Sequence, residues 1–243
     1  MSQLDGKIAI VTGGGTGIGK GIAKAFAREG AKLVIASRNR DNLAATAAEL
    51  RPEGATVIEA PTDVTDEAQV IALFKRTMEK FERLDILVNN SGTFDGGPID
   101  ELSLETWQHV IDVNLTGVFL CTREAMKIMK QQQGGRIINI GSISAKVPRP
   151  DSAPYSTSKH GLVGLTKATA LEGRKYGISA GALHPGNVLT EWRAASDSPT
   201  DQEPMMNPDD LAVAALAMAA MPPYANMLES VVLPVEQLFV GRG

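Results

Sequence analysis

Short apolar runs alternate with segments of helical periodicity along the whole chain. The apolar runs predict seven strands, at 7–12, 32–37, 56–61, 84–89, 136–140, 178–184 and 229–233. The periodic segments predict helices at 18–29, 40–50, 67–81, 103–133, 155–176 and 211–221. Strands that alternate with helices build a parallel sheet covered on both faces. We therefore expect an α/β fold, a doubly wound Rossmann-type sheet of seven parallel strands, in a single domain over residues 1–243.

The alternation is interrupted between Glu191 and Pro208, where serine, aspartate and proline are frequent. This segment follows Pro185-Gly186, at the carboxyl end of a predicted strand. Ligands of open α/β sheets bind beyond the carboxyl ends of the strands. We expect residues of about 190–210 to form a substrate lid.

Composition and charge exclude several classes of function. The chain is 43% apolar and 21% charged, as in ordinary globular proteins, and its net charge of -4 includes no long run of like charges. A basic face for nucleic acid or an anionic membrane is therefore not expected. No segment approaches the ~20 apolar residues of a membrane span, and the first residues show no targeting pattern. We expect a cytoplasmic protein.

Cysteine and histidine offer no catalytic or metal-binding cluster. The single cysteine, Cys121, lies in an apolar helical segment and is interpreted as a small buried hydrophobic residue. The three histidines, His109, His160 and His184, are scattered, and we expect no bound metal.

A glycine-rich turn joins the first strand to the first helix. Such a turn allows close backbone approach and directs helix N–H groups at a pyrophosphate. The strand–turn–helix context makes a dinucleotide site the favoured interpretation. The expected cofactor-binding residues of the turn are Gly13, Gly15, Thr16, Gly17, Ile18 and Gly19.

The end of the second strand predicts which dinucleotide binds. NAD-preferring enzymes carry an acid there against the ribose, whereas arginine accommodates a 2′-phosphate. This strand ends Ser37-Arg38, so NADP(H) is preferred, with NAD(H) as the alternative. Arg38 and Arg40 as a pair of solvated arginines is the competing explanation. Five further cofactor contacts are expected, two after the third strand, at Asp63 and Val64, and three after the fourth, at Asn90-Ser91-Gly92.

Tyr155 and Lys159 are four residues apart on a predicted helix and project from one face. Hydride transfer to a carbonyl needs a proton donor, and a nearby ammonium is expected to lower the pKa of a tyrosine toward neutrality. Ser142 follows a strand at the same sheet edge, where its hydroxyl could hold the carbonyl oxygen. Asn114 interrupts an apolar helix beside Gly117, which indicates either a role beyond helicity or close helix packing.

Taken together, these residues resemble the short-chain dehydrogenase/reductase family. The resemblance covers the pattern Thr-Gly-x-x-x-Gly-x-Gly at 12–19, the segment 89–92, Asn114, Ser142, Tyr155 and Lys159. It implies that Tyr155 is the general acid/base, that Ser142 orients the substrate oxygen, that Lys159 binds the ribose and tunes Tyr155, and that Asn114 anchors a proton-relay water.

The resemblance also implies further contacts and an assembly. Pro185, Gly186, Val188 and Thr190 are similar to the family's nicotinamide-binding strand end. Relatives usually form homotetramers or homodimers, often through the two long helices, here 103–133 and 155–176. Ser91 stands where the family usually has alanine. The tail, with 223–227 and 233–238, is similar to the branch acting on 3-hydroxy acids and serine, and differs from acyl-carrier reductases.

Two other functions compete with that of an oxidoreductase. Gly177-Ile178-Ser179-Ala180-Gly181 matches the hydrolase pattern G-x-S-x-G, but Ser179 opens a predicted strand where a nucleophile elbow needs a strand-to-helix turn. An NADP(H)-binding regulator without turnover is the alternative, and the presence of Ser142, Tyr155 and Lys159 argues against it. The sequence favours an oxidoreductase acting on a small carbonyl or secondary alcohol.

Overall fold

Within residues 2–194 and 203–239, which the computed structural model describes, seven strands form one sheet in the order β3-β2-β1-β4-β5-β6-β7. All neighbouring pairs are parallel. The strands are β1 (Ile8–Thr12), β2 (Lys32–Ser37), β3 (Val57–Pro61), β4 (Ile86–Asn89), β5 (Gly135–Ile140), β6 (Ile178–Pro185) and β7 (Glu229–Val232). The strand order reverses between β1 and β4, which is the switch point at which open sheets bind ligands.

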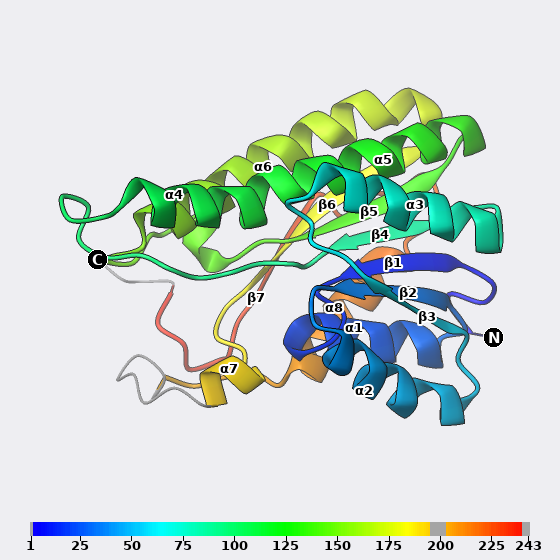
Figure 1. Ribbon diagram of the computed structural model, residues 1–243, viewed down its shortest axis with the longest axis horizontal. Coiled ribbons are helices and arrows are strands. Elements are labelled where there is room, and N and C mark those ends of the chain that lie inside the picture. The colour runs from blue at the N-terminus through cyan, green and yellow to red at the C-terminus, as the bar shows by residue number, and fades with distance from the viewer. Residues whose placement is uncertain (1, 195–202, 240–243) are drawn as a thin grey trace.

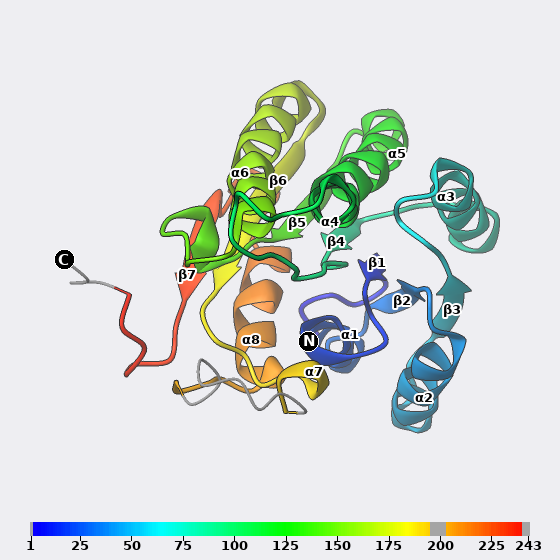
Figure 2. The same cartoon turned by 60° about the vertical axis from the view of Figure 1, so that its left-hand side comes forward.

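Helices cover both faces of the sheet (Figure 1). One face carries α1 (Gly17–Arg28), α2 (Arg40–Leu50) and α8 (Pro208–Ala219); the other carries α3 (Glu67–Phe81), α5 (Gly117–Gln132) and α6 (Ala153–Gly173) (Figure 2). Each face has its own core, centred on side chains such as Phe26 and Met218 on the first and Phe74 and Met129 on the second. The predicted doubly wound Rossmann-type fold is confirmed.

The helix expected over 103–133 is wrong as a single α-helix. It divides into α4 (Leu104–Ile111), a π-helical turn η2 (Asp112–Thr116) and α5. Such wide turns insert an extra residue and often mark functional sites. Asn114 lies in this turn, and Gly117 begins α5 directly against Val64: a Cβ at Gly117 would lie 2.8 Å from Val64 Cγ2. Gly117 is thus closely packed, but against the loop that follows β3 and not against another helix.

Two other helices differ from expectation at their ends. The helix expected over 211–221 begins earlier, at Pro208, because Asn207 and Asp210 form a capping box before the apolar residues start. The helix expected over 155–176 is α6 followed by a 3₁₀ turn, η4 (Arg174–Tyr176). Two 3₁₀ turns that the sequence did not predict are η1 (Arg51–Glu53) and η3 (Ile143–Ala145). No helix in the described ranges is long and apolar enough to cross a bilayer.

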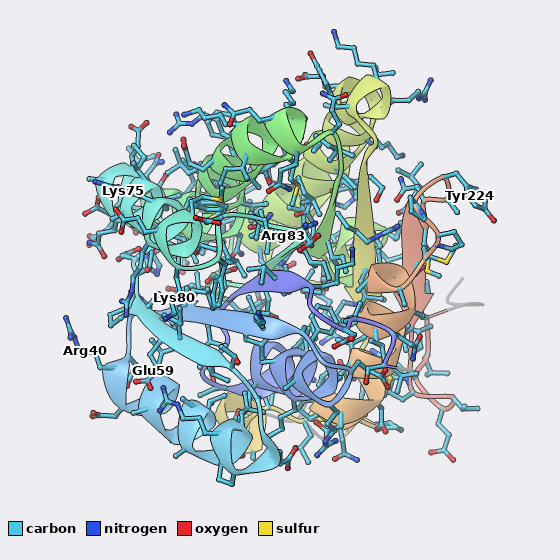
Figure 3. The ribbon with its side chains drawn as sticks, turned by 90° about the vertical axis from the view of Figure 1, so that its right-hand side faces the viewer. Arg40, Glu59, Lys75, Lys80, Arg83 and Tyr224 are labelled. Atoms are coloured by element: carbon cyan, nitrogen blue, oxygen red, sulfur yellow. The ribbon has the colours of Figure 1, made fainter. Side chains whose placement is uncertain are left out.

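A buried carboxylate, that of Asp85, lies at the amino ends of the strands. Asp85 Oδ2 accepts hydrogen bonds from Ile8 N at 2.9 Å and from Arg83 Nε at 2.9 Å. Figure 3 views the molecule from this side, with Arg83 labelled near the centre. The polar residues expected to bind ligands lie at the opposite edge, where the strands end.

Candidate functional site

The glycine-rich turn between β1 and α1 has a backbone conformation and close contacts that leave little room for side chains at its glycines. Gly13 and Gly17 have positive φ angles of 64° and 51°, a region that glycine adopts without strain. A Cβ on Gly19 would collide with Gly13 O and with Asn90 Nδ2. The turn therefore packs on itself and on β4, and leaves an open backbone at the start of α1.

Asn90 and Ser91 hold this turn in place. Asn90 Nδ2 donates to Thr12 O at 3.0 Å and to Gly13 O at 3.3 Å. The backbone N–H groups of Asn90 and Ser91 both donate to Thr12 Oγ1, at 3.0 and 3.1 Å. Ser91 contributes through its backbone, which explains why serine can replace the alanine that is usual in the family.

The end of β6 reaches the same turn. A Cβ on Gly17 would lie 3.0 Å from Thr190 Cγ2, and Gly17 N donates to Glu191 Oε2 at 2.8 Å. Glu191 opens the short helix α7 (Glu191–Ala194). A carboxylate thus lies on the amino end of α1, where the helix dipole favours negative charge. Sequence analysis missed Glu191, because only the fold brings it to α1.

Two parts of the segment after β6 lie side by side. Val188 pairs with Met206 in a parallel bridge, and Leu189 N donates to Met206 O at 2.8 Å. Pro185 and Gly186 lie before this bridge, and Gly186 N donates to Val232 O at 2.8 Å. Of the lid expected at about 190–210, residues 195–202 lie outside the described residues.

The end of β2 also borders the glycine turn. A Cβ on Gly15 would lie 3.3 Å from Ser37 Oγ, and the following Arg38 is exposed. Arg40 extends from the start of α2 away from the neighbouring side chains (Figure 3). Both arginines are exposed, and Arg38 directly follows the residue whose side chain borders the turn.

Asp63 and Val64, which follow β3, are occupied by local contacts. Asp63 Oδ1 accepts hydrogen bonds from Thr65 N at 2.9 Å and from Thr65 Oγ1 at 2.7 Å. Val64 is buried against Gly117. The segment shapes the wall between β3 and α5 beside the sheet's carboxyl edge.

The four residues expected to be catalytic come together at this edge. Lys159 Nζ donates to Ile140 O at 3.0 Å and lies 5.6 Å from the centre of the Tyr155 ring. The Ser142 side chain faces Tyr155 and acts to lower the pKa of its hydroxyl. A Cβ on Gly92 would lie 3.4 Å from Asn114 Oδ1 and 3.9 Å from Lys159 Nζ.

Asn114 is fully buried, and both atoms of its amide group are hydrogen-bonded. Its Oδ1 accepts from Thr93 N at 2.8 Å, while Nδ2 donates to Thr93 O at 2.9 Å and to Ser158 Oγ at 3.3 Å. The π turn η2 presents this side chain to the segment after β4. Asn114 therefore ties the catalytic helix α6 to the strand end that carries Gly92.

The pKa values of the acid/base pair move in a direction that corrects one expectation. Burial raises the pKa of Tyr155, and the opposing effects of the Ser142 hydrogen bond and of the Arg193 and Arg149 charges are smaller. The expected lowering of this pKa by Lys159 is thus wrong for the protein without ligand. Burial also lowers the pKa of Lys159 itself to about 8, because removal from water disfavours the charged ammonium.

Arg149 belongs to a polar cluster beside the segment that follows β6. It is partly buried, and its Nη2 donates to Asn187 Oδ1 at 3.0 Å and lies 3.6 Å from Glu203 Oε2. Asn187 Nδ2 in turn donates to Glu203 Oε2 at 2.7 Å. These three side chains link the loop before α6 to both arms of the segment that leaves β6.

The rival sites do not have the geometry they need. Ser179 is buried near the start of β6, inside a strand rather than on a strand-to-helix elbow. Cys121 is buried on α5, where burial raises the pKa of its thiol to about 12. Among the residues that the structure describes, no group of three or more His, Cys, Asp or Glu is placed to hold a metal ion.

Comparison with known proteins gives matches over most of the chain. A family model described as short chain dehydrogenase matches residues 7–201. The chain is 41% identical over 192 residues to a 3-oxoacyl-[acyl-carrier-protein] reductase of Synechocystis sp., covering 79% of this chain and 78% of the reductase. It is 36% identical over 235 residues to an uncharacterized oxidoreductase of Staphylococcus aureus, covering 97% of this chain and 100% of that protein.

A solved structure shares the fold in detail. The crystal structure of a short-chain type dehydrogenase/reductase from Mycobacterium marinum superimposes with a TM-score of 0.90 at 33% sequence identity. The superposition covers 94% of this chain and 94% of the other.

Proposed function

Because the chain belongs to the short-chain dehydrogenase family, whose members are oxidoreductases acting on alcohol and carbonyl groups with a nicotinamide cofactor, we propose that it is NADP(H)-dependent. In this proposal it transfers hydride between the nicotinamide and a small carbonyl compound or secondary alcohol. Tyr155 is the general acid/base. The observation that carries the proposal is the convergence of Ser142, Tyr155 and Lys159 at the carboxyl edge, beside the glycine turn.

The glycine turn fits a dinucleotide. Its backbone has no Cβ atoms where a pyrophosphate would approach, and the first N–H groups of α1 face the same space. The bound nicotinamide would supply or accept the hydride. We propose that the cofactor is held by Gly13, Gly15, Thr16, Gly17, Ile18, Gly19, Ser37, Arg38, Asp63, Val64, Asn90, Ser91, Gly92, Tyr155, Lys159, Pro185, Gly186, Val188 and Thr190.

Each member of the catalytic group has a separate task. During reduction, Tyr155 gives its hydroxyl proton to the carbonyl oxygen, which becomes negative as the carbon is reduced. Ser142 donates a hydrogen bond to the same oxygen and keeps it within reach of Tyr155. Lys159 contributes positive charge that favours the tyrosinate left behind. Asn114 fixes the geometry through Thr93 and Ser158, and takes part in proton return.

The high pKa of Tyr155 in the free protein is compatible with this role. A protonated phenol is the form that donates during reduction, and burial keeps Tyr155 protonated at neutral pH. Oxidation needs the tyrosinate instead. The positive charge of an oxidised nicotinamide favours that form, so cofactor state and proton transfer are coupled.

Two further parts of the proposal concern the assembly of subunits and the lid over the substrate. The outer faces of α5 and α6 form a groove lined by Phe119, Met126, Leu165 and Thr169, and Phe119 is 45% exposed. We propose that this face joins subunits in a homodimer or homotetramer, which sedimentation equilibrium would measure.

The segment 190–210 is proposed to close over the substrate, starting from α7.

Replacing Arg38 by alanine is expected to weaken NADPH binding about 10–100-fold, because a charge-assisted hydrogen bond to the 2′-phosphate is worth about 1.5–3 kcal/mol. NADH binding should change by less than about 3-fold. Fluorescence titration with both cofactors measures the two dissociation constants. Arg40→Ala is the matched control, since Arg40 points away from the turn. Equal losses of NADPH and NADH affinity in R38A would remove Arg38 from the 2′-phosphate site.

Replacing Glu191 by glutamine is expected to tighten cofactor binding about 2–5-fold. The Glu191 carboxylate lies 2.8 Å from Gly17 N, at the helix end that would hold the pyrophosphate, and neutralising a charge there changes the free energy by about 0.3–1 kcal/mol. The amide can still accept the Gly17 hydrogen. Because the pyrophosphate is common to both cofactors, NADPH and NADH should gain equally. Unchanged or weaker binding would show that Glu191 does not compete with the cofactor.

The function itself is tested by titrating the purified protein with NADPH and NADH, followed by a panel of ketones, aldehydes and 3-oxo acids. Saturable NADPH binding with carbonyl-dependent oxidation is the expected result. NADPH binding without turnover on any compound would favour the regulator instead. Absence of binding to either cofactor would contradict the proposal.

A further inference from the structure

A completely buried histidine lies against the peptide of Ser142. His184 is on β6, and its Nδ1 is 3.2 Å from Ser142 N and 3.0 Å from Ser142 O. The ring is so close to β5 that a Cβ on Gly141 would overlap it. The backbone that leads into Ser142 is therefore shaped around this imidazole.

The other ring nitrogen faces a carboxylate. His184 Nε2 lies 3.2 Å from Glu229 Oε1, on the neighbouring strand β7. Glu229 is also paired with Lys146, which follows η3. A continuous polar chain thus runs from Lys146 through Glu229 and His184 to Ser142.

His184 Nδ1 lies within hydrogen-bond distance of both polar atoms of the Ser142 backbone: the contact to Ser142 N fits an unprotonated Nδ1, and the contact to Ser142 O fits a protonated one. The Glu229 carboxylate beside Nε2 favours the neutral tautomer that carries its hydrogen on Nε2, which leaves Nδ1 able to accept from the Ser142 N–H. Protonation of Nδ1 would break this arrangement: the ring would donate to Ser142 O, and the Ser142 N–H would lose its acceptor.

The charges around His184 favour the neutral ring. Burial is the strongest influence and lowers the pKa of His184, whereas the Glu229 carboxylate and a hydrogen bond from the protonated ring to the Ser142 backbone raise it. The positive charges of Lys146 and of Lys159, on α6, lower it further. The neutral ring is therefore favoured near pH 7.

We propose that His184, oriented by Glu229, is a positioning residue for Ser142: its unprotonated Nδ1 accepts the Ser142 amide hydrogen and fixes the direction of the Ser142 hydroxyl. The Ser142 hydroxyl accepts a hydrogen bond from Ser144 N at 3.1 Å and acts on the pKa of Tyr155. A rotation of the Ser142 peptide would disturb both contacts. This inference rests on the proposed function, because it assumes that Ser142 orients the substrate oxygen.

Two substitutions at His184 separate the effect of losing the hydrogen-bond acceptor from the effect of losing the volume of the ring. His184→Asn can place its amide oxygen near the position of Nδ1, while His184→Phe fills the same volume without an acceptor. We expect H184F to lower kcat about 10–100-fold, as small misplacements near reacting atoms do, with the NADPH dissociation constant unchanged within about 2-fold. H184N should recover most of the loss. A fully active H184F, or equal losses in both variants, would overturn the proposal.

Nitrogen NMR of the wild-type protein gives a readout that needs no substrate. The chain has three histidines, so the spectrum of H184N, or of the wild type against His109 and His160 variants, identifies the His184 signals. We expect an unprotonated Nδ1 and a protonated Nε2 at pH 7.5. A protonated Nδ1 at this pH would overturn the proposal even if H184F failed to fold.

Glu229→Gln tests the link to the carboxylate. The amide oxygen can still accept from Nε2, but the negative charge that favours protonation of His184 is gone. The acid limb of the kcat profile should therefore move to lower pH in E229Q, and an unchanged limb or a move to higher pH would contradict the inference. A wild-type protein without carbonyl-dependent oxidation would overturn the proposed function, whereas an active wild type with a fully active H184F would overturn the positioning role alone.

Discussion

Replacing Tyr155 by phenylalanine is expected to lower kcat by about 10²–10⁴-fold, the range typical for the loss of a general acid. The substitution removes only the hydroxyl. The ring packs edge-to-face on Phe94, with centroids 5.1 Å apart, and this contact does not involve the hydroxyl. NADPH affinity and the unfolding temperature should therefore stay close to the wild-type values.

The measurement is steady-state kinetics of Y155F with NADPH and the best carbonyl compound from the panel, together with cofactor titration. Tyr224→Phe is the matched control, because Tyr224 is 93% exposed and far from the site (Figure 3). Y224F should behave as the wild type. Turnover by Y155F within a few-fold of the wild-type rate would exclude Tyr155 as the acid/base.

Replacing Lys159 by methionine is expected to remove activity and to stabilise the free protein at pH 7. Lys159 is 6% exposed, and burial lowers its pKa to about 8 from its ordinary value of 10.5. Its charge is thus disfavoured in the folded state. Removing a buried, uncompensated charge is worth about 1–3 kcal/mol, partly offset by the lost hydrogen bond to Ile140 O. Activity should fall because Tyr155 loses the neighbouring positive charge.

The pH dependence of this gain follows from the direction of the pKa change. Between about pH 8 and 10.5 the unfolded chain holds the Lys159 proton while the folded protein has released it, so wild-type stability rises with pH in this interval. Below about pH 8 the full cost is present. K159M should therefore be more stable than the wild type at pH 7 and lose this advantage as the pH rises toward 10.

Urea denaturation of the cofactor-free proteins at pH 7 and 9.5 tests this expectation. Lys167→Met, at an exposed position of the same helix, controls for the general effect of a lysine-to-methionine change. A K159M protein that is less stable than the wild type at both pH values would show that the ammonium is well solvated. In that case the charge of Lys159 would cost the folded protein little stability. A site that is shaped for function at the expense of stability would instead show a clear cost.

The fold was predictable because it depends on local patterns, and the proposed site residues could be named for the same reason. Continuous apolar runs such as 8–12 and 86–89 match strands that are buried on both faces of the sheet. The glycine turn and the Tyr155–Lys159 spacing are contiguous in sequence, so their chemistry could be interpreted before any packing was known.

Other features depend on tertiary contacts and left no local signal. The π turn η2 does not alter the apolar periodicity of 103–133 enough to be detected, although Asn114 and Gly117 indicated something unusual there. The direction of the Tyr155 pKa change comes from burial, which the sequence does not give. His184, Glu191 and Arg149 meet their partners only across strands or between distant segments, at separations of 42, 174 and 38 residues.

The hydrogen bonds that tie the glycine turn to β4 bear on the entropy of cofactor binding. Ordering the backbone of one residue costs roughly 1–2 kcal/mol, so a mobile turn over 13–19 would consume several kcal/mol of binding free energy. Here Thr12 Oγ1 and Asn90 Nδ2 hold the turn in the protein alone. The ligand therefore meets a preorganised surface, and its contacts can contribute to affinity instead of to loop ordering.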